Sequence, residues 1–191
     1  MTRPRRINWP DLAGELAGKV RPETRSKYFP KNPLRRYLIS RFLETVASKL
    51  AQSEWNSLLD VGCGEGFVDY YLSLRFPGRP VTGLESDPDA LRIARSINPS
   101  FCCLAGDGRG LPFPDHAFDA AVCIEVLEHI IDFRKVIDEL ARVSSGVCVI
   151  SVPGFPWYQG SNFLVGKNWP RLGEHPDHLV RFTRRKLESE M

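Results

Sequence analysis

The sequence has no long apolar run, few cysteines and no internal repeats. Among its 191 residues no apolar stretch approaches the ~20 that a membrane-spanning helix needs. The five cysteines are odd in number and irregularly spaced, which disfavours a disulfide framework and favours a reducing compartment. The basic N-terminus is followed by no apolar stretch, so a secretory signal is not expected. With 42% hydrophobic and 26% charged residues, the composition predicts a globular, cytoplasmic protein with no membrane association.

Charge is distributed unevenly along the chain. Residues 1–50 contain 12 Lys or Arg and 4 Asp or Glu, whereas the remainder contains 14 and 19. Such a basic segment either meets an anionic partner, such as RNA, a phosphorylated metabolite or a membrane surface, or forms a solvated helix face. Because its basic residues are scattered, the solvated face is the simpler interpretation.

From residue 57 onward, apolar stretches alternate with helical periodicity. Strands are predicted at residues 57–61, 80–84, 101–105, 117–124 and 147–152. Helices are predicted over residues 67–74, after Asp87 and Pro88, and after Asp132. Continuous apolar strands that alternate with helices are typical of a parallel sheet buried between helices. We therefore predict an α/β fold with a doubly wound, mostly parallel sheet, whose core spans residues 53–153.

Two segments flank the predicted core. Residues 1–52 are expected to form a basic helical extension, loosely organised up to residue 31 apart from a helical patch at 12–20. A helix then starts at Asn32 and Pro33, with apolar residues at helical spacing: Leu34, Tyr37, Leu38, Phe42, Val46 and Leu50. Residues 154–191 combine a loop rich in glycine, proline and aromatic residues with a short helix capped by Thr183. The aromatic residues Trp157, Tyr158 and Trp169 either wall a substrate pocket or form a satellite hydrophobic cluster.

A glycine-rich turn follows the first predicted strand. Gly62, Gly64 and Gly66 let the backbone turn tightly and approach a ligand, and free amides at the following helix N-terminus are expected to face that ligand. Glu85, at the end of the second strand, can accept both ribose hydroxyls of an adenosine-containing cofactor. Phe67 stands where a dinucleotide fingerprint needs glycine. A negative Asp60 beside the turn suits a ligand with ammonium and sulfonium charges better than a pyrophosphate.

Five stretches, in order and correctly spaced, resemble the class I S-adenosylmethionine-dependent methyltransferases, especially the small type 11-like enzymes. They are residues 60–66, 81–85, 106–113, 118–122 and 125–129. The resemblance covers residues 57–152 and is specific for the superfamily but not for the substrate. It implies a Rossmann-like methyltransferase core with S-adenosylmethionine as cofactor.

The resemblance also implies roles for individual residues. Gly62, Cys63 and Gly64 would pass their backbone along the methionine part of the cofactor, and Asp60 would lie near its ammonium group. Glu85 would hold the ribose hydroxyls. Adenine would lie beside Ser86, accept contacts from the Gly108 backbone and donate its amino group to Asp107, and Glu125 would lie close to the transferable methyl group.

The acceptor is not identified by any dedicated motif. Residues 123–126 are Cys-Ile-Glu-Val, not the Asn/Asp-Pro-Pro-aromatic motif of amino-directed nucleic-acid enzymes, and no Pro-Cys dipeptide of cytosine C5 enzymes occurs. We expect methyl transfer to a small molecule. Methylation of RNA or protein, or a non-catalytic cofactor-binding subunit, are the alternatives, and a nicotinamide dehydrogenase is disfavoured.

Histidines supply the candidate acid–base chemistry. His129 is the best-placed general base, although a packed structural histidine is an equal interpretation. His175 and His178 face the acceptor or bind a metal, but no third ligand is evident at suitable spacing, so no metal is expected. The strand cysteines are interpreted as small core residues: Cys102, Cys103, Cys123 and Cys148.

The C-terminus departs from the family pattern. The superfamily normally adds two strands after the fifth, and here only 38 residues follow Pro153. The fold is therefore expected to lack the last two strands, which leaves the fifth strand as an apolar edge. A homodimer partner, or strands of a longer parent chain, would cover that edge.

Overall fold

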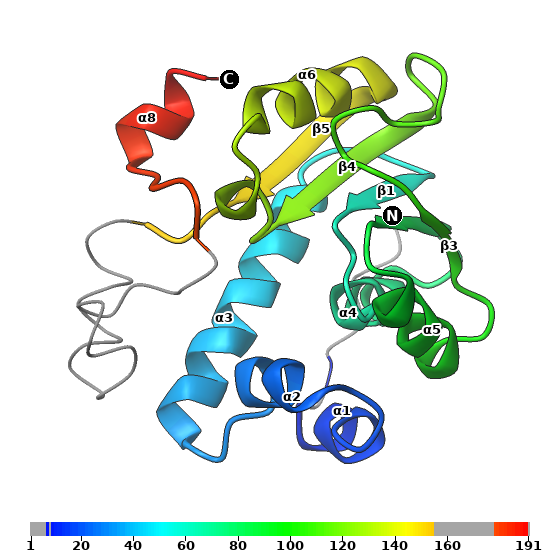
Figure 1. Ribbon diagram of the computed structural model, residues 1–191. Coiled ribbons are helices and arrows are strands. Elements are labelled where there is room, and N and C mark those ends of the chain that lie inside the picture. The colour runs from blue at the N-terminus through cyan, green and yellow to red at the C-terminus, as the bar shows by residue number, and fades with distance from the viewer. Residues whose placement is uncertain (1–6, 8, 155–177, 191) are drawn as a thin grey trace.

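One parallel sheet organises the molecule. The computed structural model describes residues 7, 9–154 and 178–190 (Figure 1). The strand bounds are β1 Leu58–Val61, β2 Val81–Glu85, β3 Cys102–Ala105, β4 Phe118–Ile124 and β5 Ser144–Ser151. The strand order is β3-β2-β1-β4-β5, and every adjacent pair is parallel. The chain leaves β1 in one direction and returns to its other side at β4, so the predicted doubly wound parallel sheet is confirmed.

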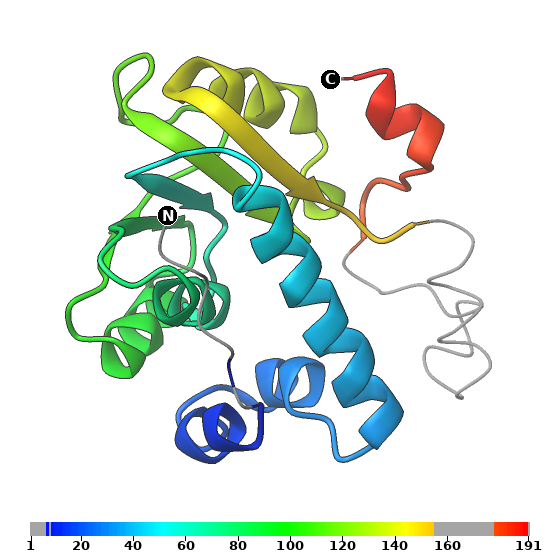
Figure 2. The same cartoon turned by 180° about the vertical axis from the view of Figure 1, so that it is seen from behind.

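Helices cover both faces of this sheet (Figure 2). Their bounds are α1 Trp9–Leu16, α2 Pro22–Tyr28, α3 Pro33–Leu50, α4 Phe67–Arg75, α5 Pro88–Ile97, the 3-10 helix η1 Leu127–His129, α6 Phe133–Val143 and α8 Arg184–Glu188. Helices α3, α4 and α5 pack on one face, and α6 packs on the other. Successive strand residues serve opposite faces: Leu58 packs in the first core and Leu59 in the second.

The predicted helix starts are mostly confirmed. Asn32 Oδ1 accepts hydrogen bonds from the amides of Leu34 and Arg35, and Asp87 Oδ1 accepts one from the amide of Asp89. Each cap precedes a proline at the first helical position, as expected. Asp132 is the N-cap residue of α6, as predicted, but its side chain makes no cap hydrogen bond and lies 3.5 Å from the Lys135 ammonium instead.

The N-terminal segment is more ordered than the sequence predicts. In addition to α1, residues 22–28 form α2, which the prolines and polar composition did not indicate. Arg21 ties the start of α2 to the core: its amide donates to Glu65 Oε2 (2.9 Å) and its guanidinium donates to Asp87 Oδ2 (2.7 Å). These contacts span more than 40 residues of sequence, which is why local patterns miss them.

Helix α3 is only half embedded in the core. Val46 and Leu50 in its C-terminal half are buried, whereas Leu34, Tyr37 and Leu38 in its first turns are 55–64% exposed. Figure 2 shows the exposed half extending from the sheet toward α2. The apolar spacing therefore predicts the helix correctly. Within the described part of the molecule, however, the apolar residues of its first turns are not buried.

The outer strands are less buried than their apolar sequences predict. Cys102 on β3 and Cys148 on β5 are exposed, so their assignment to the core is wrong, whereas Cys103 and Cys123 are buried as expected. The exposed cysteines lie on strands at the two ends of the described sheet, where one side lacks a neighbour. A partner copy or further strands beside β5 remain a prediction.

Strand β5 begins three residues earlier than predicted, because α6 leads directly into Ser144. Gly146 allows this start, since a Cβ there would lie 2.6 Å from the carbonyl oxygen of Asp119. The sheet register is irregular at the same point, between Phe118 and Ala120. Close backbone approach at a bulge is a common use of glycine.

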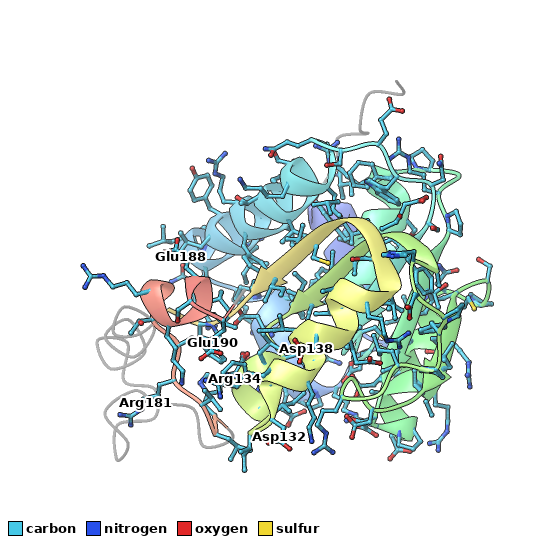
Figure 3. The ribbon with its side chains drawn as sticks, turned by 90° about the horizontal axis from the view of Figure 1, so that it is seen from above. Asp132, Arg134, Asp138, Arg181, Glu188 and Glu190 are labelled. Carbon is cyan, nitrogen blue, oxygen red and sulfur yellow. The ribbon has the colours of Figure 1, made fainter. Side chains whose placement is uncertain are left out.

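The C-terminal segment returns to the sheet. Phe182 forms an isolated bridge with Gly154, and the predicted Thr183 cap of α8 is confirmed by a hydrogen bond from the Lys186 amide. Figure 3 shows Glu190, after α8, beside Arg134 on α6, with which it forms an ion pair. No helix in the described ranges is both long and apolar enough to cross a membrane. The sequence-predicted residues Trp157, Tyr158, Trp169 and His175 lie outside the described residues.

Candidate functional site

A two-part cleft opens at the carboxyl ends of β1, β2 and β4. The outer cleft has a volume of about 560 Å³ and is lined by residues that include Leu84, Glu85, Ser86, Asp107, Gly108, His129 and Leu179. The inner pocket has about 200 Å³ and is lined by residues that include Thr24, Lys27, Tyr28, Asp60, Cys63 and Gly64. Gly62 and Glu125 line both parts. Ligands of open α/β sheets bind at such a switch point.

The glycine turn forms the boundary of the two parts. Gly62 and Gly64 have φ values of +80° and +55°, which L residues rarely adopt. A Cβ at Gly62 would lie 2.4 Å from a methyl group of Val126, so the turn packs directly on the segment after β4. A Cβ at Gly64 would meet nothing within 4 Å and would project into open space. The backbone at Gly64 therefore leaves room for a ligand.

The first three amides of the turn are bonded within the protein and are not free for a ligand. The amides of Gly62 and Cys63 both donate to the carbonyl of Leu84, at 2.7 and 3.2 Å. The amide of Gly64 donates to Glu85 Oε2 at 2.9 Å. The turn thus anchors itself to β2, because β1 and β2 are adjacent and their carboxyl ends lie side by side.

Glu85 is held at the end of β2 by the surrounding backbone. Besides Gly64, its carboxylate accepts hydrogen bonds from the amides of Ser86 (2.7 Å) and Asp87 (2.9 Å), and from the Ser86 hydroxyl (3.0 Å). Glu85 and Ser86 both line the outer cleft, as the sequence predicts. The carboxylate is therefore preorganised, and Oε2, with a single protein donor, can accept from a ligand hydroxyl.

Asp60 lies at the bottom of the inner pocket, facing a second buried carboxyl group. Asp60 on β1 and Asp69 on α4 are each 1% exposed, and neither has a hydrogen-bond partner for its carboxylate oxygens among the described residues. Burial, followed by the negative charge of Glu85, raises the pKa of Asp60 to about 7. Burial and the neighbouring Asp60 raise the pKa of Asp69 well above its usual range. Sequence reasoning missed Asp69, whose signal is a lone acidic residue among the buried side chains of α4.

The thiol of Cys63 stays protonated. Burial, together with Asp69, Asp60 and Glu85, raises its pKa. Cys63 therefore contributes shape and its backbone to the inner pocket and not a thiolate nucleophile.

Asp107 and Gly108 lie on the far wall of the outer cleft. The Arg109 side chain and amide hold the Asp107 carboxylate, with Nε 3.0 Å from each oxygen, and lower its pKa to about 2. Half of the Asp107 side chain remains exposed, so it can also accept from a ligand. A Cβ at Gly108 would lie 2.9 Å from a methyl group of Val61, which shows that glycine is needed for this close approach.

Glu125 lies where the outer cleft and inner pocket meet. It follows β4 with a φ of +58°, a conformation that is unusual for a non-glycine residue. Its Oε1 accepts a hydrogen bond from the Ser151 hydroxyl (3.2 Å), and burial raises its pKa although Lys27 opposes the shift. Strained backbone is often retained at binding sites.

Helix α2 covers the inner pocket, and sequence reasoning missed this role. Thr24, Lys27 and Tyr28 line the pocket together with the residues of the glycine turn. The Tyr28 ring packs on Phe67 at a centroid distance of 4.3 Å. The only signal in the sequence is the basic character of the N-terminal segment, whose Arg21 pairs with Glu65 and Asp87.

His129, the candidate base of the sequence analysis, borders the outer cleft. It ends η1, and its side chain is 40% exposed, with Nε2 3.9 Å from Glu128 Oε1. His178, from the segment before α8, packs against it edge to face, with ring centroids 5.2 Å apart. The fold thus joins His129 to one of the two loop histidines singled out in the sequence.

The match to a known protein family covers the same core. The family described as "Methyltransferase domain" matches residues 59–150. A fatty-acid O-methyltransferase of Mycolicibacterium smegmatis is 34% identical over 112 residues, which cover 58% of this chain and 40% of the relative. A ubiquinone biosynthesis O-methyltransferase of Chromobacterium violaceum is 32% identical over 112 residues, covering 56% and 44%. The chain therefore spans less than half the length of these two relatives.

Solved structures show the same fold. YcgJ from Bacillus subtilis has a TM-score of 0.64 and 22% identity, covering 79% of this chain and 66% of that one. CalS10 from Micromonospora echinaspora, an amino pentose methyltransferase solved with S-adenosylmethionine bound, has a TM-score of 0.52 and 30% identity, covering 61% and 52%.

Proposed function

We propose that this chain, which belongs to the class I S-adenosylmethionine-dependent methyltransferases, transfers a methyl group to a small-molecule acceptor. S-adenosylmethionine supplies a methyl group on a positively charged sulfur. In this proposal the inner pocket takes the methionine part of the cofactor, and the outer cleft takes the adenosine part and the acceptor. Residues 1–52 cover the inner pocket, residues 53–153 form the cofactor-binding core, and residues 154–191 contribute to acceptor binding.

The buried carboxylate of Asp60 carries this assignment. It lines the inner pocket and lacks a hydrogen-bond partner among the described residues, and an unpaired buried charge is costly. The ammonium group of the cofactor would supply the missing opposite charge. At the other end of the cleft, the preorganised Glu85 suits a ribose and the Gly108 backbone suits the edge of a base.

A small acceptor is supported by the relatives and by the cleft. The matched relatives are named for a fatty acid and for ubiquinone biosynthesis. The outer cleft, at about 560 Å³, falls in the range of small-molecule sites, ~300–1,000 Å³. RNA or protein acceptors, and a subunit that binds the cofactor without catalysis, are the competing outcomes of the test below.

Calorimetry with S-adenosylhomocysteine tests the cofactor assignment. We expect one site per chain, no binding of NAD, and at least about tenfold weaker binding in Glu85→Gln, since a hydrogen bond to a charged group contributes about 1.5–3 kcal/mol. Glu188→Gln, on exposed α8 outside the lining of both cavities, is the matched control and should bind as the parent does. Absence of S-adenosylhomocysteine binding by the parent would contradict the proposal.

Transfer of a labelled methyl group into cell extract tests the acceptor. The extract is fractionated into small molecules, RNA and protein after incubation with the parent chain. Label in the small-molecule fraction supports the proposal. Label in RNA or protein, or cofactor binding without transfer to any fraction, would replace it by the corresponding alternative.

A further inference from the structure

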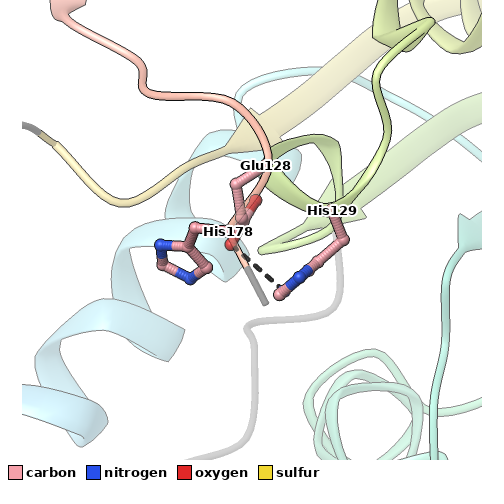
Figure 4. Close-up of side chains that lie close together, drawn as sticks. All are labelled: Glu128, His129 and His178. Atoms are coloured by element: carbon pink, nitrogen blue, oxygen red, sulfur yellow. Dashed lines mark ion pairs between the residues drawn. The ribbon is translucent and has the colours of Figure 1, made fainter. Parts of the chain in front are cut away.

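Three potential metal ligands converge beside the outer cleft, and one of them, His129, lines it. Glu128 and His129 belong to η1, and His178 precedes α8, yet one ligand atom from each lies within 4.8 Å of the others. Figure 4 shows the Glu128 carboxylate between the two imidazole rings, with its ion pair to His129. Fifty residues of sequence separate Glu128 from His178, so only the fold brings the third ligand to this pair.

The Glu128 carboxylate is buried and incompletely satisfied. It is 2% exposed, and its Oε2 has no hydrogen-bond partner among the described residues. Burial of a carboxylate without full compensation is costly, and a bound cation is one of the few groups that removes the cost. This unpartnered oxygen is an observation independent of the clustering, and it points to a positively charged ligand.

The backbone holds the cluster together. The carbonyl of Glu128 accepts hydrogen bonds from the amides of Leu179 (2.8 Å) and Val180 (3.0 Å), which places His178 against η1. Phe182 then packs on Phe133 with ring centroids 4.9 Å apart and is 1% exposed. The segment that carries His178 is therefore held by contacts to η1 and to the start of α6, and the three ligands are preorganised.

We propose that Glu128, His129 and His178 bind one divalent first-row transition-metal ion such as Zn²⁺, Mn²⁺ or Co²⁺. Two imidazoles with one carboxylate suit these ions, whereas Mg²⁺ and Ca²⁺ prefer oxygen ligands. A three-ligand protein site leaves coordination positions open for water or substrate. The sequence alone does not indicate a metal site, because the third ligand cannot be recognised from spacing.

The location of the ion suggests what it does. His129 and Leu179 line the outer cleft on the same wall as Glu125. Building on the proposed function, the ion would hold an oxygen of the acceptor, orient it and lower the pKa of a bound hydroxyl, whose proton leaves to solvent. The acceptor is then an oxygen compound, such as an alcohol, a phenol or a carboxylic acid. As a ligand, His129 would not serve as the general base expected from the sequence.

Metal binding is measured directly on the full chain after removal of metals with a chelator. Titration with Mn²⁺, followed by the loss of the electron paramagnetic resonance signal of the free ion, should give one site per chain. Co²⁺ should give visible absorption bands that change when acetohydroxamate, a bidentate oxygen ligand, occupies the open positions. Mn²⁺ also limits interference from the exposed thiols of Cys102 and Cys148, since thiolates prefer softer ions.

Variants separate this site from adventitious binding. Glu128→Gln, His129→Asn and His178→Asn should each weaken Mn²⁺ binding by about 100-fold or more, since loss of outer-shell partners alone costs 10–100-fold. His116→Asn is the matched control, because His116 is exposed and lines neither cavity, and it should bind as the parent does. Circular dichroism and unfolding curves show whether each variant is folded.

The two proposals fail separately. No stoichiometric Mn²⁺ or Co²⁺ binding by the parent, or binding that the three substitutions leave unchanged, overturns the metal site even when S-adenosylhomocysteine binds. Failure of S-adenosylhomocysteine to bind overturns the proposed function even when the metal site is present. Metal binding without any effect of acetohydroxamate on the Co²⁺ spectrum overturns the acceptor-holding role.

Discussion

The carboxyl groups of Asp60 on β1 and Asp69 on α4 face one another in the core, and the negative charge of Asp60 raises the pKa of Asp69. Both side chains are 1% exposed. Two carboxylates without a donor between them are stable only when at least one holds a proton. The stability of the fold and the charge of the inner pocket that Asp60 lines should therefore both depend on pH.

The first prediction concerns stability. Because both pKa values are raised in the folded state, the native protein binds more protons than the unfolded chain above about pH 4. The unfolding free energy should fall as pH rises from about 4 to 7, with contributions from both groups of up to ~1.4 kcal/mol per pH unit each. Above about pH 7, where Asp60 is ionised, only Asp69 continues to contribute. Urea unfolding at a series of pH values measures this slope.

Asp69→Asn should flatten that slope and stabilise the chain at pH 8, because the amide can donate to an ionised Asp60. Asp119→Asn is a control, because the contribution of Asp119 to stability changes with pH in the opposite direction. The pKa of Asp119 is lowered by hydrogen bonds from Asn56 and Ser57, so its stabilisation is lost as pH falls through its folded-state pKa. An unchanged slope in Asp69→Asn would show that the two carboxyl groups do not share a proton.

The second prediction concerns cofactor affinity. If the ammonium group of the ligand pairs with ionised Asp60, the affinity for S-adenosylhomocysteine should rise up to about tenfold per pH unit below pH 7 and level off above it. 5′-Methylthioadenosine lacks the amino-acid part and should show no such rise. Calorimetry from pH 5.5 to 8.5 measures both. Parallel pH profiles of the two ligands would place the ammonium group elsewhere.

The third prediction compares two glycines with the same backbone strain. Gly64 and Gly78 have φ values of +55° and +83°, and a Cβ at either would meet nothing within 4 Å. Alanine should therefore destabilise both variants by about 1–2 kcal/mol through backbone strain alone. Only Gly64→Ala projects a methyl group into the inner pocket, and we expect S-adenosylhomocysteine to bind it at least tenfold more weakly, ~1.4 kcal/mol. Equal affinities of the two variants would mean that the ligand does not pass Gly64.

The fourth prediction uses the strained conformation of Glu125. Glycine relieves a positive φ, so Glu125→Gly should leave the unfolding free energy within about 1 kcal/mol of the parent or above it, while methyl transfer falls by about 100-fold. His116→Gly relieves a φ of +54° at an exposed site and should leave methyl transfer unchanged. Full activity of Glu125→Gly would indicate that this carboxylate neither contacts nor positions the reacting groups.

Much of the core is predictable because its signals are local. The alternation of apolar strands and helices predicts the parallel sheet, and Asn32 and Asp87 mark helix starts through bonds to amides only two or three residues away. The turn at Gly62 and Gly64 can be recognised in the sequence because positive φ values favour glycine. The edge positions of Cys102 and Cys148 were not predictable, since strand order depends on pairing between distant segments.

The parts of the site that the sequence missed depend on distant contacts. Helix α2 has a polar, proline-marked sequence and becomes the cover of the inner pocket through the bonds of Arg21 to Glu65 and Asp87. In the sequence Asp69 resembles any polar helix residue, and only the tertiary packing brings its carboxyl group next to Asp60. In both cases the long-range partner gives the residue its role.

The sequence by itself determined the class of fold and the position of the glycine turn, since these follow from the alternation of apolar strands with helices and from the backbone freedom of glycine, whereas the cofactor followed from the family resemblance. Tertiary structure alone decided which side chains meet beside the cleft. His178 meets Glu128 and His129 because the amides of Leu179 and Val180 bond to the Glu128 carbonyl and Phe182 packs on α6. Those contacts form only when the C-terminal segment docks, so no local pattern contains them.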